Sequence, residues 1–262
     1  MKADRKSLRD QFFKLHPLCC FCGGSRPATT EDHQPARSIF DERNWPEGYS
    51  FPACSECNAT SRSHENVFAI LTRLGPSGPR TESQRKELHK YLDAAKNNFP
   101  GLLHPMSTRE KRAFYKAEGL KLPQGALFSE LDMCALDARL TEDSTLIILR
   151  KLLCALHYKH TNDILPPSGK MFIRWMTNAY THRGELFADF LSLLSGRPQL
   201  VRNRVTLNDQ FDYTFVVDPN GSSFSAYFCM FRDSIAGYGI VMDSSKIDTT
   251  EFDAVELYSP LA

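Results

Sequence analysis

Four cysteines form two pairs of identical spacing, and together they have the pattern of a zinc site. Two residues separate the members of each pair, and the four are Cys19, Cys22, Cys54 and Cys57. This spacing lets both thiolates of a pair reach one ion, so that two pairs complete the tetrahedral coordination typical of structural zinc. Because the protein would fill every ligand position, we expect this Zn²⁺ to stabilise the fold and to have no catalytic role.

An acid, a base and an amide lie inside or directly beside the cysteine pairs. Asp32 and His33 are adjacent in the segment between the pairs, and Asn58 follows the last cysteine directly. Carboxylate and amide oxygens suit hard divalent ions, whereas thiolates select zinc. An imidazole can exchange a proton near neutral pH. Zinc binding would therefore bring together residue types that can bind a second metal ion and move a proton.

The order of these residues resembles that of the HNH, or ββα-metal, nuclease family. The shared elements are a Cys-x-x-Cys pair, an Asp-His-x-x-Pro motif that ends at Pro35, a central Asn44, and a closing Cys-x-x-Cys-Asn. The resemblance covers about a quarter of the chain. It implies a β-hairpin crossed by a helix, with the zinc ion holding the two halves of the site together.

The resemblance also implies a role for each matched residue. His33 would be the general base that takes a proton from water, and Asn44 would help to orient it. Asp32 and Asn58 would hold one catalytic Mg²⁺ or Mn²⁺ through their oxygens. The implied activity is metal-dependent hydrolysis of DNA phosphodiester bonds, leaving a 5′-phosphate and a 3′-hydroxyl. By analogy with family members that carry an extra domain, a defence or restriction-type enzyme is expected.

Two other functions stay open. Paired Cys-x-x-Cys motifs also occur in zinc ribbons that bind nucleic acid without catalysis. A nuclease effector could also be held inactive until its C-terminal domain meets a signal. The place of His33 between Asp32 and the zinc-anchored Asn58 favours an enzyme over a simple binding protein. Glu65, on the same helix face as Asn58, either assists the metal site or is a plain surface carboxylate.

The other cysteines are expected to be spectators or core residues. Cys20 has only a one-residue gap to Cys22, which strains a shared tetrahedral site, so we interpret it as a spectator. Apolar runs surround the rest, which are predicted to be small buried side chains: Cys134, Cys154 and Cys229. Cys154 also begins a three-residue spacing with His157 and His160, for which helix packing is favoured over a second metal site.

The positive charge of the chain is concentrated in one segment. The net charge is +1 overall, but counting Lys+Arg against Asp+Glu gives +1 for residues 1–75, +5 for 76–121 and −5 for 122–262. Phosphate binding requires clustered cations more than an overall basic chain. The predicted DNA contacts are four cations of the middle segment and two that flank the proposed site: Lys86, Lys90, Arg109, Arg112, Arg37 and Arg62. Solvated helix faces are the alternative explanation.

Length and periodicity predict an α+β chain of two domains. The 262 residues, 42% of them hydrophobic, suffice for more than one core. A zinc-stapled HNH domain at 1–75 would be followed, after a boundary rich in proline and glycine, by an α+β domain at 76–262. The second domain is predicted to be helical over 80–195 and to form antiparallel strands over 200–245. It shows no catalytic motif, so a ligand, a protein partner and homodimer formation all stay open.

Helix signals place the motifs within this outline. Lys6 to Leu15 predicts a short amphipathic helix, and Cys57 to about Leu74 predicts the helix that crosses the hairpin. Thr81 and Ser107 each begin a capping-box sequence, so they are expected to open two helices of the basic segment.

The chain is expected to be cytoplasmic and to have no membrane partner. Its start lacks an apolar signal core, and its apolar runs are far shorter than the ~20 residues that a spanning helix needs. In a reducing compartment, cysteine pairs bind metal in preference to forming disulfides.

Overall fold

The computed structural model describes residues 5–75, 81–122, 124–131, 133–177, 188–219, 221, 223–246 and 255–261. Within these ranges the chain is a mixed α+β protein with a C-terminal antiparallel sheet, as the sequence predicted. The N-terminal part contains a two-stranded hairpin followed by helices. Its elements are α1 (Arg5–Leu15), β1 (Thr30–His33), β2 (Ser50–Ala53), α2 (Ser55–Thr60) and α3 (Arg62–Leu71).

The hairpin lies where the motifs predicted it. Strands β1 and β2 are antiparallel, with Thr30 opposite Ala53 and His33 opposite Ser50. The loop between them contains two short 3-10 helices, η1 (Arg37–Ile39) and η2 (Asp41–Arg43). The helix expected from Cys57 begins two residues earlier and is interrupted at Ser61, so it forms the successive helices α2 and α3.

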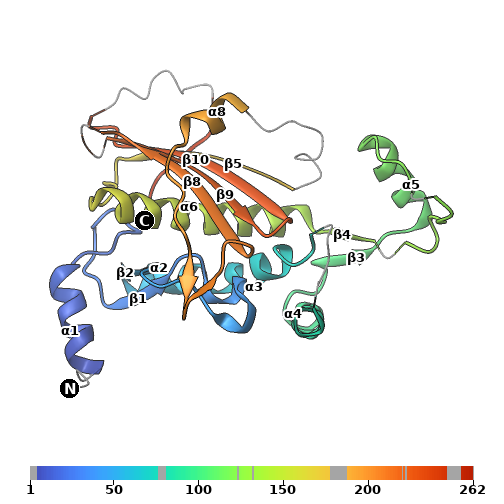
Figure 1. Ribbon diagram of the computed structural model, residues 1–262, viewed down its shortest axis with the longest axis horizontal. Coiled ribbons are helices and arrows are strands. Elements are labelled where there is room, and N and C mark those ends of the chain that lie inside the picture. Colours follow the sequence, from blue (N-terminus) through green and yellow to red (C-terminus); the bar gives the residue numbers. More distant parts are fainter. Residues whose placement is uncertain are drawn as a thin grey trace.

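Both predicted capping boxes open helices of the basic segment. Thr81 caps α4 (Glu82–Asn98), and Ser107 caps α5 (Thr108–Ala117), each through reciprocal bonds with the residue three positions on. A small two-stranded sheet, β3 (Leu103–Pro105) with β4 (Cys134–Leu136), connects this segment to the rest. Figure 1 shows α5 at the end of a green arm that extends away from the other layers.

The C-terminal part is built from one long helix and one sheet. Helix α6 (Ala138–Thr161) starts at an Asp137 side chain that accepts a bond from the Leu140 amide, 2.7 Å away. The sheet has the order β11-β5-β10-β9-β8, and every neighbouring pair is antiparallel. The strands are β5 (Lys170–Thr177), β8 (Phe211–Val217), β9 (Phe224–Phe231), β10 (Ile235–Met242) and β11 (Leu257–Tyr258).

Strand β5 corrects the prediction of a helical region over 80–195. Met171 and Ile173 of this strand are buried and alternate with less buried neighbours, which is the two-residue period of a strand. Apolar residues dominate this short stretch, so periodicity alone does not separate a strand from a buried helix. Pairing with strands distant in the sequence makes this stretch a strand, because β5 pairs with both β10 and β11.

Helix α6 is the layer that joins the sheet to the N-terminal hairpin module (Figure 1). Gly237 and Gly239 of β10 let it approach closely, since a Cβ there would lie 2.8 Å from a methyl carbon of Leu149 and 2.3 Å from one of Leu153. On its opposite side, α6 packs against α3, where His64 Nδ1 lies 3.1 Å from Ser144 Oγ. Helix α8 (Ala188–Leu193) lies on the other face of the sheet.

The N-terminal module and the C-terminal sheet share one hydrophobic cluster. Phe68 of α3 packs edge-on against Phe231 of β9, with ring centroids 4.8 Å apart. The end of the chain also returns to the module, where the Leu261 amide donates to the Phe21 carbonyl over 2.7 Å. The boundary predicted between the domains falls mostly on residues 76–80, which lie outside the described residues.

Some expected burial is not found. Cys134, predicted to be buried, is exposed because it lies in the short peripheral strand β4. Leu8 and Leu15 of α1 are also exposed, since this helix extends away from the core at the N-terminal end (Figure 1). Cys154 and Cys229 are buried as expected. No helix in the described part of the chain combines the length and apolarity needed to cross a bilayer.

Candidate functional site

The four predicted zinc ligands come together at one point. The ligand atoms of Cys19, Cys22, Cys54 and Cys57 all lie within 4.8 Å of one another, and all four residues are buried. A tetrahedral zinc ion with Zn–S bonds of about 2.3 Å places its sulfurs about 3.8 Å apart, so the cluster has the right size. A buried set of four soft sulfur donors can hold a metal ion such as zinc.

Backbone hydrogen bonds shape both cysteine turns. In the first, the Gly24 amide donates to the Cys19 carbonyl over 2.9 Å, and Gly24 has φ of +75°, which glycine adopts without strain. In the second, Cys54 is the N-cap of α2, and its sulfur accepts from the Cys57 amide at 3.4 Å. The Cys20 amide donates to the Pro52 carbonyl over 3.0 Å and ties the first turn to β2.

The ionisation of the thiols also fits a cation at their centre. A hydrogen bond from Cys57 lowers the pKa of Cys19 to about 5, so this residue is the first to become a thiolate. Burial and the negative charge of Cys19 raise the pKa of Cys22 to about 11. Sharing a proton with Cys19 raises the pKa of Cys57 far above its usual value. A dication would remove this competition by stabilising all the thiolates at once.

His33, at the end of β1, is held by three neighbours. Its Nδ1 lies 3.0 Å from the Ser50 hydroxyl, and its Nε2 accepts from the Arg37 guanidinium. The ring stacks on Trp45, with centroids 4.8 Å apart and planes inclined by 28°. Burial, followed by the positive charge of Arg37, lowers the pKa of His33 to about 4. The imidazole is therefore neutral at pH 7, and its contacts assign the proton to Nδ1.

Arginines from distant parts of the chain surround Trp45. The guanidinium carbon of Arg37 lies 3.5 Å from the ring centroid, and that of Arg202 lies 4.2 Å from it. Burial, and then the charges of Arg43 and Arg202, lower the pKa of Arg37. Within the described part of the chain, these three arginines form no ion pair with a carboxylate at 4.0 Å or less. Glu31 attracts Arg37 from a longer range and offsets part of this positive charge, which lies beside a neutral imidazole.

Arg202 reaches this site on a small hairpin of the C-terminal part. Strands β6 (Val201–Arg202) and β7 (Val205–Thr206) pair across a two-residue turn. Asn203 and Arg204 form the turn, with φ of +50° and +67°. The Glu47 amide donates to the Val201 carbonyl over 3.0 Å, which fixes the hairpin against the loop that carries Trp45.

Asp32 points away from this arginine cluster and into the interior. Its side chain is 8% exposed and accepts a charged hydrogen bond from Lys151 of α6, which is fully buried. The same ammonium lies 2.5 Å from Ser61 Oγ and 3.8 Å from Glu65 Oε1. Burial raises the pKa of Glu65, whose carboxylate also accepts from Ser61 at 2.6 Å. Adjacent residues of a strand face opposite sides of the sheet, so Asp32 faces the interior whereas His33 faces the arginine cluster.

The two predicted asparagines have different surroundings. The Asn58 amide nitrogen donates to Thr30 Oγ1 over 3.1 Å, and Thr30 lies on the same face of β1 as Asp32. Asn58 and Asp32 therefore flank one side of the hairpin. Asn44 is exposed after η2, and Ser50 makes the contact with His33 that would orient its ring.

The cations predicted to bind DNA differ in exposure. Arg37 is half-buried at His33. The other five are exposed: Arg62, Lys86, Lys90, Arg109 and Arg112. Lys86 and Lys90 lie on α4, and Arg109 and Arg112 lie on the outlying helix α5. The six residues of this prediction are thus spread over η1, α3, α4 and α5.

As predicted, helix packing explains the three-residue spacing of Cys154, His157 and His160. His157 Nδ1 lies 2.8 Å from Ser225 Oγ, and His160 Nε2 lies 2.9 Å from the Tyr213 hydroxyl. Cys154 contacts Met171. Among the described residues, the cluster that could bind a metal through His, Cys, Asp or Glu is the four-cysteine one.

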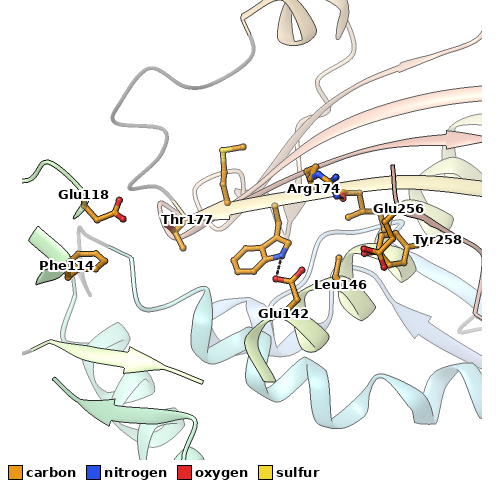
Figure 2. Close-up of a pocket in the computed structure, with 11 residues that line it drawn as sticks. Phe114, Glu118, Glu142, Leu146, Arg174, Thr177, Glu256 and Tyr258 are labelled. Carbon is orange, nitrogen blue, oxygen red and sulfur yellow. Dashed lines mark hydrogen bonds between the residues drawn. The ribbon is translucent and has the colours of Figure 1, made fainter. Parts of the chain in front are cut away.

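A separate cleft of about 470 Å³ lies between α5, α6, β5 and the end of the chain. Figure 2 shows Glu142 on its wall, with Phe114 and Glu118 opposite. Trp175 also lines the cleft, and its indole nitrogen donates to the Glu142 carboxylate over 3.1 Å. None of the predicted catalytic, zinc-binding or DNA-binding residues lines this cleft.

Sequence reasoning missed four residues that contact the predicted set: Ser50, Trp45, Arg202 and Lys151. For Lys151 a signal was present, because two charged residues, Arg150 and Lys151, interrupt the otherwise apolar run at 146–156. Ser50 is the cross-strand partner of His33 in the hairpin, Trp45 stacks on His33 from the loop, and Arg202 reaches the site by lying over Trp45. Comparison with known proteins adds no relative, since no family model, curated protein or solved structure matches this chain.

Proposed function

We propose that this protein is an endonuclease that hydrolyses DNA phosphodiester bonds at His33. The observation that carries the proposal is a neutral imidazole placed beside arginines that form no close ion pair within the described residues, on a hairpin that carries a four-cysteine cluster. This combination supplies a base, an anion site and a rigid frame, which phosphodiester hydrolysis requires. The motif order adds support by resemblance to the HNH family.

The arginine cluster suits a phosphate group. Arg37 and Arg202 both lie against Trp45, so an anion near the indole edge could accept hydrogen bonds from two guanidinium groups. Such bonds would stabilise the charge that develops on phosphorus oxygens when water attacks. Arg43 adds long-range attraction because its charge acts on the same site.

Phosphate binding would also release the base. Arg37 donates to His33 Nε2 in the unliganded protein, and a phosphate would draw the guanidinium toward itself. Nε2 could then take a proton from the attacking water, while Ser50 holds the other ring nitrogen. Neutralising the arginines would raise the low pKa of His33 and make it a stronger base.

The catalytic Mg²⁺ or Mn²⁺ implied by the resemblance does not fit Asp32 and Asn58 as they are arranged. Lys151 already neutralises Asp32, and the Asn58 side chain is bonded to Thr30. A dication about 4 Å from a buried ammonium would be repelled by about 8 kcal/mol at an effective dielectric constant of 20. The proposed roles of His33, Arg37 and Arg202 therefore involve no metal ion at Asp32.

A cleavage assay with matched histidine variants tests the proposal. Wild type, His33→Ala and His89→Ala would be incubated with supercoiled plasmid and with single-stranded DNA, with and without Mg²⁺ or Mn²⁺. His89 is exposed on α4 and serves as the control. We expect cleavage by wild type and His89→Ala, and at least a hundredfold loss in His33→Ala. Equal cleavage by all three proteins would show that His33 is not the base.

The buried Asp32–Lys151 pair favours a second candidate, a catalytically silent DNA-binding protein. If the pair is purely structural, the same arginines would hold phosphate without cleaving it. The assay separates the two functions when DNA binding is measured in parallel. Binding without cleavage in every metal condition would replace the nuclease with this alternative. Activity that appears only with a further factor would instead support a nuclease gated by its C-terminal part.

A further inference from the structure

Lys151 is a fully buried ammonium surrounded by oxygen atoms. Its contacts are the Asp32 carboxylate, the Ser61 hydroxyl at 2.5 Å and the Glu65 carboxylate at 3.8 Å. These three residues come from β1, from the junction of α2 and α3, and from α3. Carboxylate and hydroxyl oxygens that converge in this way are the donors a hard divalent cation would use. Here a side chain of the protein itself supplies the positive charge.

The position of Lys151 on α6 directs it into this cluster. Ser144 lies seven residues earlier, on the same helix face, and its hydroxyl contacts His64 of α3. The opposite face, with Leu149 and Leu153, is packed on the sheet. The aromatic ring of Phe21 lies 5.0 Å from the Lys151 nitrogen and covers it from the zinc side. Exposing the ammonium would require α6 to leave both of the layers it contacts.

We propose that Lys151 is the resident cation of the hairpin module and excludes a divalent ion from Asp32. The ammonium occupies the oxygen cluster, ties β1 to α3 through α6, and leaves zinc at the four cysteines as the metal ion of this module. This role for Lys151 goes beyond the proposed function and does not depend on it, because it concerns cation binding whether or not the protein cleaves DNA.

A metal-binding titration tests this role directly. Zinc-loaded protein, with its zinc content verified, would be titrated with MnCl2, and free Mn²⁺ would be followed by electron paramagnetic resonance. The reference is the double variant Asp32→Asn/Lys151→Met, which removes both charges and leaves neither partner buried and unpaired. Lys151→Met alone empties the cluster while keeping its oxygens. Lys159→Met is the matched control on the same helix, because Lys159 instead contacts the Gly48 carbonyl at the surface.

We expect wild type, Lys159→Met and the double variant to bind Mn²⁺ equally weakly. Lys151→Met should gain one site at least tenfold tighter than wild type, and Mn²⁺ should raise the melting temperature of this variant alone. One Mn²⁺ bound more tightly by wild type than by the double variant would overturn the proposal. A folded Lys151→Met protein with no gain in affinity would overturn it equally, since the oxygens would then not form a divalent-ion site. If Lys151→Met does not fold, the comparison of wild type with the double variant decides.

Discussion

Two buried positions in this protein gather electron-rich groups that can surround a positive charge, and they differ in the source of that charge. The four-cysteine cluster consists of soft sulfur donors from two turns and can hold a metal ion from solution, such as zinc. The oxygen cluster of Asp32, Ser61 and Glu65 takes its cation from α6, as the ammonium of Lys151. We expect the first to depend on the supply of metal, whereas the second forms whenever the chain folds.

The difference follows from what each site must hold together. The four cysteines are buried in the same hydrophobic cluster as α3 and α6, but they bring four ionisable thiols together, and a metal ion would stabilise all of their thiolates at once. The oxygen cluster lies between α3 and α6, where its carboxylates already have an ammonium as partner. A buried ion pair there contributes little net stability but is costly to break from one side.

Loss of a zinc ligand is the largest effect expected in this comparison. Cys57→Ser should remove zinc binding and leave the hairpin module unfolded, because structural zinc contributes on the order of 10 kcal/mol to small domains. The variant should lose any cleavage activity through misfolding. Circular dichroism, thermal unfolding and zinc analysis measure these effects. Cys134→Ser is the control, since Cys134 is exposed and should tolerate the change within about 0.5 kcal/mol. A well-folded, fully active Cys57→Ser protein would contradict the assigned role of the cluster.

Breaking the ion pair should have the next largest effect. Lys151→Met leaves the carboxylate of Asp32 buried without its partner, and we expect a loss of about 3–5 kcal/mol in the free energy of unfolding. The double variant Asp32→Asn/Lys151→Met should recover most of this loss and lie within about 2 kcal/mol of wild type. Urea unfolding of wild type, Asp32→Asn, Lys151→Met and the double variant gives the coupling energy between the two side chains. Additive losses would show that the pair is not energetically coupled.

The sequence predicted the two positions unequally. Cys19 and Cys57 could be assigned because ligand spacing within a turn is a local property. The hairpin, the capped helices of the basic segment and strands β8 to β10 were likewise visible as local patterns. The partner of Asp32 could not be predicted, because Lys151 is 119 positions away and meets it only through the packing of α6 on α3. The contact of Arg202 with Trp45 and the pairing of β5 with β10 likewise join residues far apart in the sequence, so local patterns do not predict them.

His157 is a third buried position, and unlike the two clusters it carries no charge in the folded protein at neutral pH. His157 of α6 is 1% exposed, and burial lowers its pKa to about 4. The negative charges of Asp163 and Asp243 act to raise this pKa, and the positive charge of Lys246 acts to lower it. The unfolded chain, with a histidine pKa near 6.5, takes up a proton as the pH falls, whereas the folded protein does not. Stability is therefore present above the unfolded pKa and is lost as the pH falls toward the folded one.

Between pH 7 and pH 5, His157 should account for a loss of about 2 kcal/mol in the free energy of unfolding. His157→Asn keeps a polar atom for Ser225 but does not titrate, so its stability should fall by that much less over the same range. Urea unfolding at both pH values measures the difference, and zinc loss or the titration of His160 affects both proteins alike. Identical pH dependence would indicate that His157 is protonated in the folded state.

The smallest effect on the fold, but a clear effect on DNA binding, is expected for cations that lie on the surface. Lys86, Lys90, Arg109 and Arg112 are exposed, so replacing all four with glutamine should leave the melting temperature nearly unchanged. If they bind phosphates, DNA affinity should fall at moderate salt, and the slope of log K against log salt should flatten by up to about 0.9 for each phosphate interaction that the substitutions remove. Arg202→Ala, with Arg204→Ala on the same hairpin as its control, should weaken binding through one phosphate group. Filter binding at several salt concentrations compares these variants, and an unchanged affinity for the fourfold variant would restrict DNA binding to the arginines around His33.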